Sequence, residues 1–241
     1  MKAIAVIPAR LESRRLPRKM LREIDGRPLV VWVYQAVRRS PLLEDVIIAT
    51  DSREILDVCR AHACKAQMTA VAHRSGTERV HEVAQAVDAE VYLNVQGDEP
   101  LIRRTHIESL LELVRDPSIQ VGTLTTPASV EDISNPNAVK VVTDNNGRAL
   151  YFSRSPIPYD RDGSRPHYFK HLGTYAYRKA ALDRFIALPE SRLERDERLE
   201  QLRFLENGIP IYVAETAYDT VGVDTEEDLA RVEKMLSRGK D

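Results

Sequence analysis

The sequence predicts an α/β protein with a mainly parallel sheet, helices on both faces of that sheet, and an antiparallel insertion in the second half. Short β-branched runs recur through the first half, helical patterns separate them, and an Asn-Gly pair at 146–147 lies between two further runs. Strands that are separated by helices are joined by crossovers, which make parallel pairs and cover both faces of the sheet.

The elements of the first half follow from these runs. Strands are expected at 2–7, 45–50, 91–95 and 121–125. Pro28 suits the first position of a helix, and Trp32 is expected to pack that helix on the sheet. Capping boxes are expected at the starts of the next helices, in Asp51 with Glu54, Ser75 with Glu78, and Thr105 with Glu108.

The second half begins with two short strands, at 139–143 and 149–153. They flank Asp144-Asn145-Asn146-Gly147, a strong hairpin signal and the basis of the expected antiparallel insertion. The elements expected beyond it are a strand at about 172–177, helices at 179–187 and 193–207, a strand at 211–215 and a helix from Thr225.

Composition restricts the class of protein. The chain has 241 residues with 35 Lys and Arg against 37 Asp and Glu, so it lacks the basic excess of proteins that wrap nucleic acid. At 43% hydrophobic and 30% charged, with no low-complexity linker, it is expected to form one globular domain over 1–241. The first residues read as a strand and not as a signal peptide, and no apolar run reaches the roughly 20 residues of a membrane span. A cytoplasmic protein is therefore expected.

The two cysteines, Cys59 and Cys64, lie five residues apart with no second Cys/His pair near them. This spacing does not suit zinc, and a disulfide is uncommon in a reducing compartment. We expect free thiols that are buried or half-buried.

A basic loop follows the first expected strand. Residues 8–19 set several arginines and Lys19 around a single glutamate. Ligands of open parallel sheets bind beyond the carboxyl ends of the strands, so this loop is expected to cradle a polyanion. It carries neither G-x-G-x-x-G nor G-x-x-x-x-G-K-[ST], which argues against a dinucleotide-binding Rossmann domain and a P-loop NTPase. A solvated basic loop is the alternative.

Acidic residues stand beside two further strands. Asp98 and Glu99 follow the strand at 91–95, and Asp224 precedes a helix cap formed by Thr225 and Asp228. A carboxylate that faces bound phosphates is a natural Mg²⁺ ligand, so Asp98 and Asp224 are candidate metal ligands. The structural alternative is that acidic residues simply favour a helix N-terminus.

Short motifs are spread between residue 4 and residue 228. They are PAR-x-x-S-x-RLP-x-K (8–19), ATD (49–51), SGTER (75–79), NVQGDEP (94–100), NPNAVKVV (135–142), ALYFSRSPIP (149–158), KHLG-x-Y-x-YR (170–178), LEQLR (199–203) and GVDT-x-ED (222–228). In these motifs the chain resembles the 3-deoxy-manno-octulosonate cytidylyltransferases, the CMP-Kdo synthetases of lipopolysaccharide synthesis. It departs from that family at Arg18-Lys19-Met20, where Gly-Lys-Pro is common.

The resemblance implies a nucleotide-binding sheet that converts CTP and free 3-deoxy-D-manno-octulosonate (Kdo) to CMP-Kdo and pyrophosphate with Mg²⁺. It also implies a homodimer, and a sugar-binding and dimerisation subdomain at about 135–178. The expected step is in-line attack of the anomeric hydroxyl on the α-phosphorus, with metal and basic side chains neutralising the phosphate charge.

The resemblance assigns residues to three groups. The nucleotide group is Arg10, Ser13, Arg15, Lys19, Ser75, Gly76 and Gln96; the sugar group is Arg79, Arg154, His171, Tyr175 and Gln201; and the catalytic group is Lys19 with the Mg²⁺ ligands Asp98 and Asp224. Several of these have structural alternatives. Ser75 can be a helix cap as well as a nucleotide contact, His171 a buried histidine, Tyr175 a core residue, and Gln201 an exposed helical position.

Two other functions stay open. Another nucleotidylyltransferase, which activates a nonulosonic acid or an amino-substituted Kdo, would share the phosphate and metal residues and differ only in the sugar pocket. A noncatalytic nucleotide-binding module would keep the fold, but the presence of both Asp98 and Asp224 argues against it.

Overall fold

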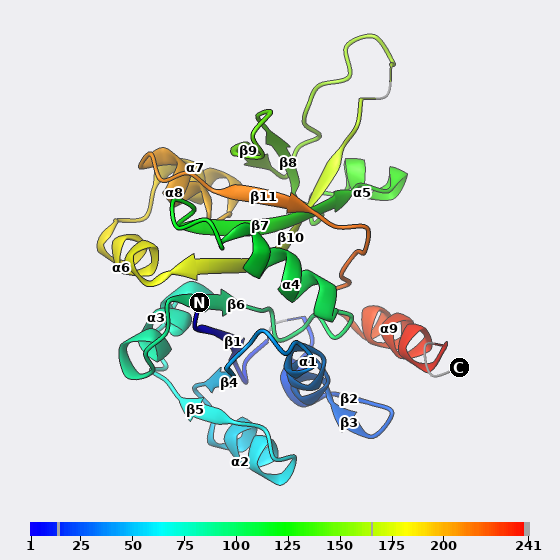
Figure 1. The fold of residues 1–241 in the computed structure, drawn as a ribbon. Helices are drawn as coiled ribbons and strands as arrows, with labels where there is room; N and C mark the ends of the chain where they lie inside the picture. The colour runs from blue at the N-terminus through cyan, green and yellow to red at the C-terminus, as the bar shows by residue number, and fades with distance from the viewer. Residues whose placement is uncertain (14, 165, 239–241) are drawn as a thin grey trace. The chain divides into compact units, whose positions relative to one another are not determined.

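The computed structural model describes residues 1–13, 15–164 and 166–238, and contacts within it divide the chain into two compact units. The first unit contains residues 1–108 and the described residues from 220 onward, and the second contains 109–219 (Figure 1). The single domain over 1–241, with its subdomain at about 135–178, stays a prediction.

The first unit is built on a parallel sheet in the order β5-β4-β1-β6, in which every pair of neighbours is parallel. Its elements are β1 (Ala3–Ala9), the 3₁₀ helix η1 (Lys19–Leu21), β2 (Glu23–Ile24), β3 (Arg27–Pro28), α1 (Leu29–Arg38), β4 (Asp45–Thr50), α2 (Arg53–Ala61), β5 (Ala66–Met68), α3 (Gly76–Ala86), β6 (Val91–Asn94), α4 (Arg104–Leu113), which continues into the second unit, and α9 (Glu226–Arg238). The expected strands and their parallel pairing are confirmed.

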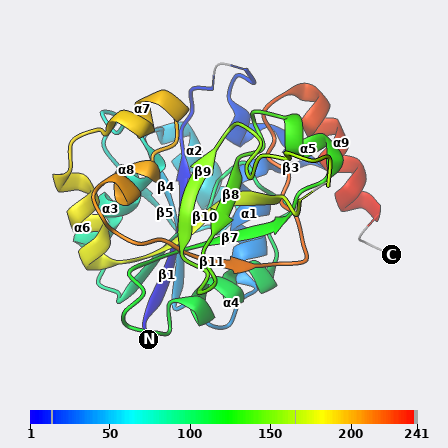
Figure 2. The same ribbon diagram turned by 90° about the horizontal axis from the view of Figure 1, so that it is seen from above.

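Helices cover both faces of this sheet, as predicted. The chain moves outward from β1 to β4 through α1 and returns from β5 to β6 through α3. Right-handed crossovers that run in opposite directions place their helices on opposite faces, and Figure 2 shows α1 and α3 on the two sides of β1. The arrangement leaves the carboxyl ends of β1 and β6 side by side at one edge of the sheet.

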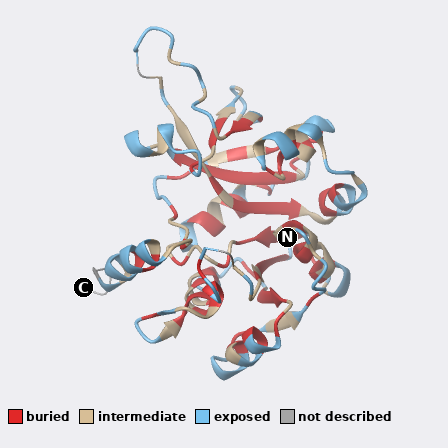
Figure 3. Cartoon of the chain, turned by 180° about the vertical axis from the view of Figure 1, so that it is seen from behind, coloured by how far each residue is buried: buried red, intermediate tan, exposed pale blue. Residues whose placement is uncertain are grey.

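Burial in the first unit follows the strands. Residues of β1, β4 and β6 are almost all buried, whereas the outer side of α9 is exposed (Figure 3). A separate apolar cluster connects α9 to the segment after β1, and its buried members are Leu16, Ile24, Leu29, Val223, Leu229 and Val232. Residues after 220 therefore belong to the same folded unit as the N-terminal strand.

The second unit is mixed. Its elements are β7 (Val121–Pro127), α5 (Val130–Ser134), β8 (Lys140–Thr143), β9 (Ala149–Ser153), β10 (Phe169–Arg178), α6 (Lys179–Ala187), α7 (Arg192–Glu197), α8 (Leu202–Glu206) and β11 (Tyr212–Glu215). Strand β7 pairs with β11 in parallel and with β10 antiparallel, and β8 pairs antiparallel with β9 and β10. The predicted antiparallel insertion is thus confirmed.

Pro28 lies directly before α1 as its N-cap, close to the expected first position, but two predicted capping boxes are wrong. Ser52 caps α2, because its hydroxyl accepts from the amide of Ile55 while the Asp51 carboxylate is bonded to Arg79. Thr105 lies inside α4, which begins at Arg104. The cap of α2 is one position later than expected, and α4 begins before the expected cap.

The helix predicted over 193–207 is also wrong, because two shorter helices, α7 and α8, occupy this segment. Arg198 adopts a left-handed conformation with φ of 55°, which ends α7, and Gln201 begins α8 as its N-cap. Nothing in the hydrophobic pattern marks Arg198 as a break, since the helical periodicity continues through it.

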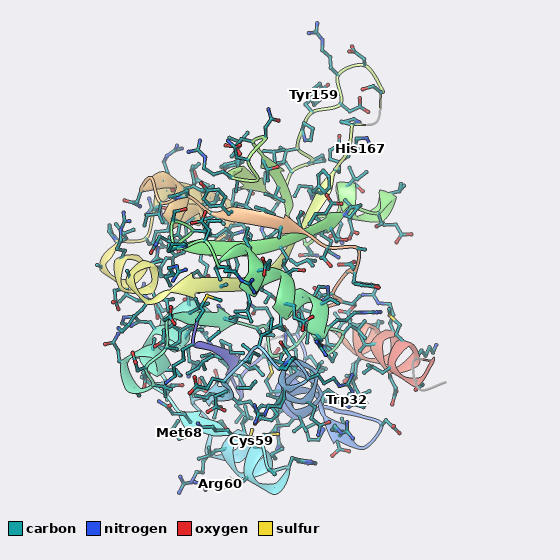
Figure 4. The ribbon with its side chains drawn as sticks, in the orientation of Figure 1. Trp32, Cys59, Arg60, Met68, Tyr159 and His167 are labelled. Atoms are coloured by element: carbon teal, nitrogen blue, oxygen red, sulfur yellow. The ribbon has the colours of Figure 1, made fainter. Side chains whose placement is uncertain are left out.

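A short hairpin, β2–β3, was not predicted. Asp25 and Gly26 form its turn with φ values of 51° and 69°, as the mirror-image turns of two-residue hairpins require. Trp32 packs on this hairpin and not on the main sheet: its indole Nε1 donates to the Ile24 carbonyl, and the Arg27 guanidinium lies 4.4 Å above its ring. Figure 4 labels Trp32 beside the hairpin.

Both cysteines are free and buried, as predicted. Burial raises the pKa of the Cys59 thiol to about 12 and that of Cys64 to about 11, so both are protonated near neutral pH. None of the helices in the described part of the chain is both long and apolar enough to span a membrane.

Candidate active site

A cavity of about 480 Å³ lies in the first unit, beyond the carboxyl ends of β1 and β6. Eight of the predicted nucleotide and metal residues line it: Arg10, Ser13, Arg15, Lys19, Ser75, Gly76, Gln96 and Asp224. They come from four stretches of the sequence, which the parallel topology brings to one edge of the sheet. A neighbouring cavity of about 1040 Å³ shares Arg10 and Ser13 and adds Arg18 and Arg53.

Lys19 joins the two predicted metal ligands. Its ammonium, on η1, donates to the carboxylates of both Asp98 and Asp224, with 3.0 Å between Nζ and Oδ1 of Asp224. Burial alone would lower the pKa of Lys19, but the two carboxylates raise it above its usual value. Lys19 is therefore an ammonium at neutral pH, and the two carboxylates meet around one positive charge.

Main-chain contacts fix this pair of carboxylates. The amide of Val223 donates to the carbonyl of Asp98 at 2.9 Å, which sets Asp224 beside Asp98. Thr225 caps α9 through a reciprocal bond with Asp228, as predicted, so capping leaves the Asp224 side chain to face Lys19. The second oxygen of Asp224 lies 2.8 Å from the Arg15 guanidinium.

Gly97 allows the segment of Gln96 and Asp98 to approach β1 closely. A Cβ on Gly97 would lie 2.8 Å from the Pro8 carbonyl and 3.0 Å from the Met20 sulfur. Contacts this short force the backbone apart, so any larger residue here displaces the end of β1 from Asp98.

Arg18 stands where the resembling family commonly has glycine. It adopts a left-handed conformation with φ of 57°, which glycine reaches without the strain of a Cβ. Its guanidinium forms an ion pair with Glu54 on α2. Arginine in place of glycine therefore makes this backbone conformation less favourable but adds a side-chain contact between the basic loop and α2. Lys19 is not affected by the difference.

Residues at the start of α3 also line the cavity. Ser75 caps the helix, as predicted, by accepting from the Glu78 amide at 3.2 Å. The Glu78 carboxylate accepts instead from the amide of Arg74, another cavity residue that sequence reasoning missed. Its place directly before the cap is the only signal that could have found Arg74.

Arg79, predicted at the sugar acid, does not line this cavity. It is fully buried within the first unit, where its Nη2 lies 2.9 Å from the Asp51 carboxylate and its Nη1 donates to Thr69. Burial lowers the pKa of Arg79, and Asp51 opposes that shift. Arg79 thus connects α3 to the ends of β4 and β5, which steadies the segment that carries Ser75.

Arg154, in the second unit, is held by main-chain oxygens. Its side chain donates to the carbonyls of Glu197 at 2.7 Å, Pro136 at 2.8 Å and Arg198 at 3.3 Å. A guanidinium has five N–H groups, so two stay available for a carboxylate. Lys140, which was not predicted, is fully buried and donates to the Arg154 carbonyl at 2.8 Å.

The other predicted sugar residues also lie in the second unit. His171 and Tyr175, both on β10, have ring centroids 5.3 Å apart, and the imidazole Nε2 lies 3.1 Å from the Thr123 hydroxyl. Tyr175 is 4% exposed and Gln201 is 5% exposed, so the alternative of an exposed helical position for Gln201 is excluded. The contacts of the sugar group with a ligand stay predictions.

The environment of His171 predicts a pH dependence of stability. Burial lowers its pKa to about 3, whereas an unfolded histidine binds a proton near pH 6.5. Between these values only the unfolded state gains a proton, so the free energy of unfolding falls as pH falls, by up to about 1.4 kcal/mol per pH unit.

Urea denaturation from about pH 7 to pH 5 should show a shallower fall in the free energy of unfolding for His171→Gln than for the wild type. The exposed His62→Gln variant is the control and should keep the wild-type slope; an equal slope in all three proteins would contradict the assignment.

The two carboxylates that meet at Lys19 are the part of the site that fits a metal ion. Carboxylate oxygens suit Mg²⁺, which commonly uses one or two of them and completes its shell with water and substrate phosphates. Within the described residues, no group of three or more His, Cys, Asp or Glu side chains lies close enough to hold a metal ion. By donor chemistry, Asp98 and Asp224 are a pair that suits Mg²⁺ and would leave the rest of its shell to other ligands.

Comparisons with known proteins place this site in context. Residues 4–215 match the family described as Cytidylyltransferase. The 3-deoxy-manno-octulosonate cytidylyltransferase of Koribacter versatilis is 68% identical over 236 residues, covering 98% of this chain and 90% of the relative. That of Acidobacterium capsulatum is 56% identical, covering 98% of this chain and 97% of the relative. A solved structure of CMP:2-keto-3-deoxy-manno-octonic acid synthetase complexed with CTP is 43% identical and has a TM-score of 0.96, covering 99% of this chain and all of that one.

Proposed function

Because the chain belongs to the cytidylyltransferase family, we propose that it transfers CMP from CTP to Kdo, giving CMP-Kdo and pyrophosphate. The observation that carries the proposal is the cavity of the first unit, where cations of the basic loop lie beside Asp224 and Lys19 is bonded to both Asp224 and Asp98. Two relatives that align with nearly the whole chain, at 68% and 56% identity, are named 3-deoxy-manno-octulosonate cytidylyltransferases.

The cations of the basic loop bind the triphosphate. Arg10, Arg15 and Lys19 line the cavity from the segment after β1, and CTP carries about four negative charges that such groups neutralise. Lys19 is the best placed, because Asp98 and Asp224 keep its ammonium charged and fix its direction. The uncharged wall of Ser75, Gly76 and Gln96 remains for the nucleoside.

Mg²⁺ belongs to the proposal, with Asp98 and Asp224 as the residues that would hold it. When bound, the ion supplies charge neutralisation and Lewis acidity at the phosphates. The protein itself keeps the two carboxylates close together, through the hydrogen bond from the Val223 amide to the Asp98 carbonyl. Turnover is therefore expected to require a divalent cation.

The acceptor is bound by residues of the second unit. Arg154 offers two N–H groups to the sugar carboxylate, and its three carbonyl partners fix its direction before the substrate arrives. His171 stays neutral because its pKa is about 3, so it binds hydroxyls without adding charge. Catalysis of this kind depends on position and electrostatics, which suits in-line attack of an anomeric hydroxyl on the α-phosphorus.

The proposal extends to a homodimer in the cytoplasm, which rests on the family resemblance. The related activities that stay open are nucleotidyl transfer to a nonulosonic acid or to an amino-substituted Kdo. They differ in the acceptor and share the cavity of the first unit.

Pyrophosphate release tests the proposed function directly. The protein is mixed with Mg²⁺, one of CTP, UTP, ATP or GTP, and one of several free sugar acids, including Kdo, its 8-amino analogue and a nonulosonic acid. We expect release with CTP and Kdo and strong rejection of UTP, because a site built for the exocyclic amino group leaves buried polar groups unmatched by a keto group. Equal release from UTP and CTP would overturn the base assignment, and release only with another acid would change the acceptor.

A further inference from the structure

The side chain of Asn94, at the end of β6, is buried and has no hydrogen-bond partner. It is 1% exposed, and neither its Oδ1 nor its Nδ2 is bonded to any described residue. Buried amides are almost always paired, because an unpaired donor or acceptor loses its bonds to water without replacement. Such a group in a folded protein points to a partner that arrives later.

The amide faces the first residue of α3, across a gap left by a glycine. A Cβ on Gly76 would lie 3.5 Å from Asn94 Nδ2, 3.6 Å from Oδ1 and 3.4 Å from the Pro8 ring, which are ordinary contacts. The missing side chain therefore leaves a space of about one methyl group beside the amide. Gly76 and Pro8, which border this space, both line the cavity, so the amide lies directly behind residues of the cavity wall.

The position of Asn94 also fits the uncharged side of the cavity. Gln96, two residues beyond the end of β6, lines the cavity. The helix that begins at Gly76 has 11 residues, and its first amides add donors at the same place. Apart from Arg74, the cations that line the cavity, Arg10, Arg15 and Lys19, come from the segment after β1.

We propose that Asn94 belongs to the nucleoside subsite: the bound nucleoside brings the hydrogen-bond partners that this amide lacks in the free protein. The inference rests on the proposed function, because it takes the cavity to be the nucleotide site. An amide presents a donor and an acceptor together, which suits a nucleoside's paired polar groups and does not suit a phosphate. Asn94 would then distinguish CTP from a triphosphate chain that carries no nucleoside.

The test compares binding of CTP and inorganic tripolyphosphate, both with Mg²⁺, by calorimetry of the full chain. We expect Asn94→Leu to weaken CTP at least about tenfold and to change tripolyphosphate less than about twofold. Without ligand, its melting temperature should equal or exceed that of the wild type, because an unpaired buried amide has been removed. A merely structural residue would instead lower the melting temperature and leave the ratio of the two affinities unchanged.

Thr174→Val is the matched control, since Thr174 is also fully buried with an unpartnered hydroxyl, but in the second unit. It should leave CTP binding unchanged.

Because leucine is larger than asparagine, Asn94→Ala is the second variant, and it should show the same selective loss of affinity for CTP. Wild-type affinity for CTP in the folded Ala variant would overturn the inference and leave the proposed function intact. A wild-type protein that binds neither probe would instead overturn the proposed function.

Discussion

Asp98→Asn and Asp224→Asn are each expected to lower kcat by at least about a hundredfold, the scale of losing one electrostatic element of a transition state. Both substitutions keep the shape of the side chain and an oxygen that can accept from Lys19, so the fold should persist. Each substitution removes one negative charge from the two carboxylates that surround the Lys19 ammonium. Steady-state kinetics with Mg²⁺ titration provide the measurement, and a higher Mg²⁺ requirement should accompany the loss.

Glu226→Gln is the control for this pair, because Glu226 is two residues from Asp224 and forms an exposed ion pair with Arg22. It should change kcat little. Near-normal kcat in a folded Asp224→Asn protein would leave Asp224 as a neighbour of the helix cap and would remove the metal assignment.

The second large effect is expected at Arg154. Truncation to alanine should lower kcat/KM for Kdo about tenfold to a hundredfold, which corresponds to about 1.5–3 kcal/mol for a hydrogen bond to a charged group. The KM for CTP should stay close to the wild-type value, because the nucleotide residues lie in the first unit. Kinetics in which each substrate is varied separately give the two values.

Two further variants sharpen this result. Arg154→Lys keeps the charge but not the planar fork that reaches three carbonyls, so it should fall between wild type and alanine. Arg161→Ala removes an exposed arginine from the same unit and should have no effect on either substrate. A loss confined to CTP would move Arg154 to the nucleotide side, and no loss would make it a structural residue.

The parts of the fold that the sequence predicted are those that depend on hydrophobic pattern and topology. The β-branched runs gave the strands, and the parallel pairing that follows from crossovers brings the basic loop and Asp98 to one edge of the sheet. Asp224 joins them through the bond from the Val223 amide to the Asp98 carbonyl. The hairpin β8–β9 followed from its Asn-Gly turn. Each of these features is set by many residues at once, so a single unusual residue does not change it.

The features that the sequence did not predict are set by single side chains. Arg198 ends α7 in a left-handed conformation, although arginine is ordinarily a good helix former. Asp51 fits a capping box by spacing, but the buried Arg79 competes for its carboxylate and leaves the cap to Ser52. The hairpin β2–β3 did carry a signal, Asp25-Gly26, between strands too short to show alternation.

Arg74 and Asn94 show the same limit in the candidate site. Both flank motif residues, and nothing in their chemistry separates them from solvated or core positions in the sequence. Only the packing of α3 against the end of β6 reveals that one lines the cavity and the other is buried beside it.

The order of the chain has a consequence for how the protein is made. The second unit lies between residues 108 and 220 of the first, and Asp224 follows it by only a few residues. During synthesis the basic loop, Asp98 and the whole second unit are therefore polymerised before Asp224. The strands β1, β4, β5 and β6 can pair early, but Val223 and α9 fill the cluster around Leu16 only afterwards. A prematurely stopped chain can thus carry the basic loop and Asp98 without the second carboxylate, and under the proposed role of Asp224 such a chain is expected to lack transfer activity.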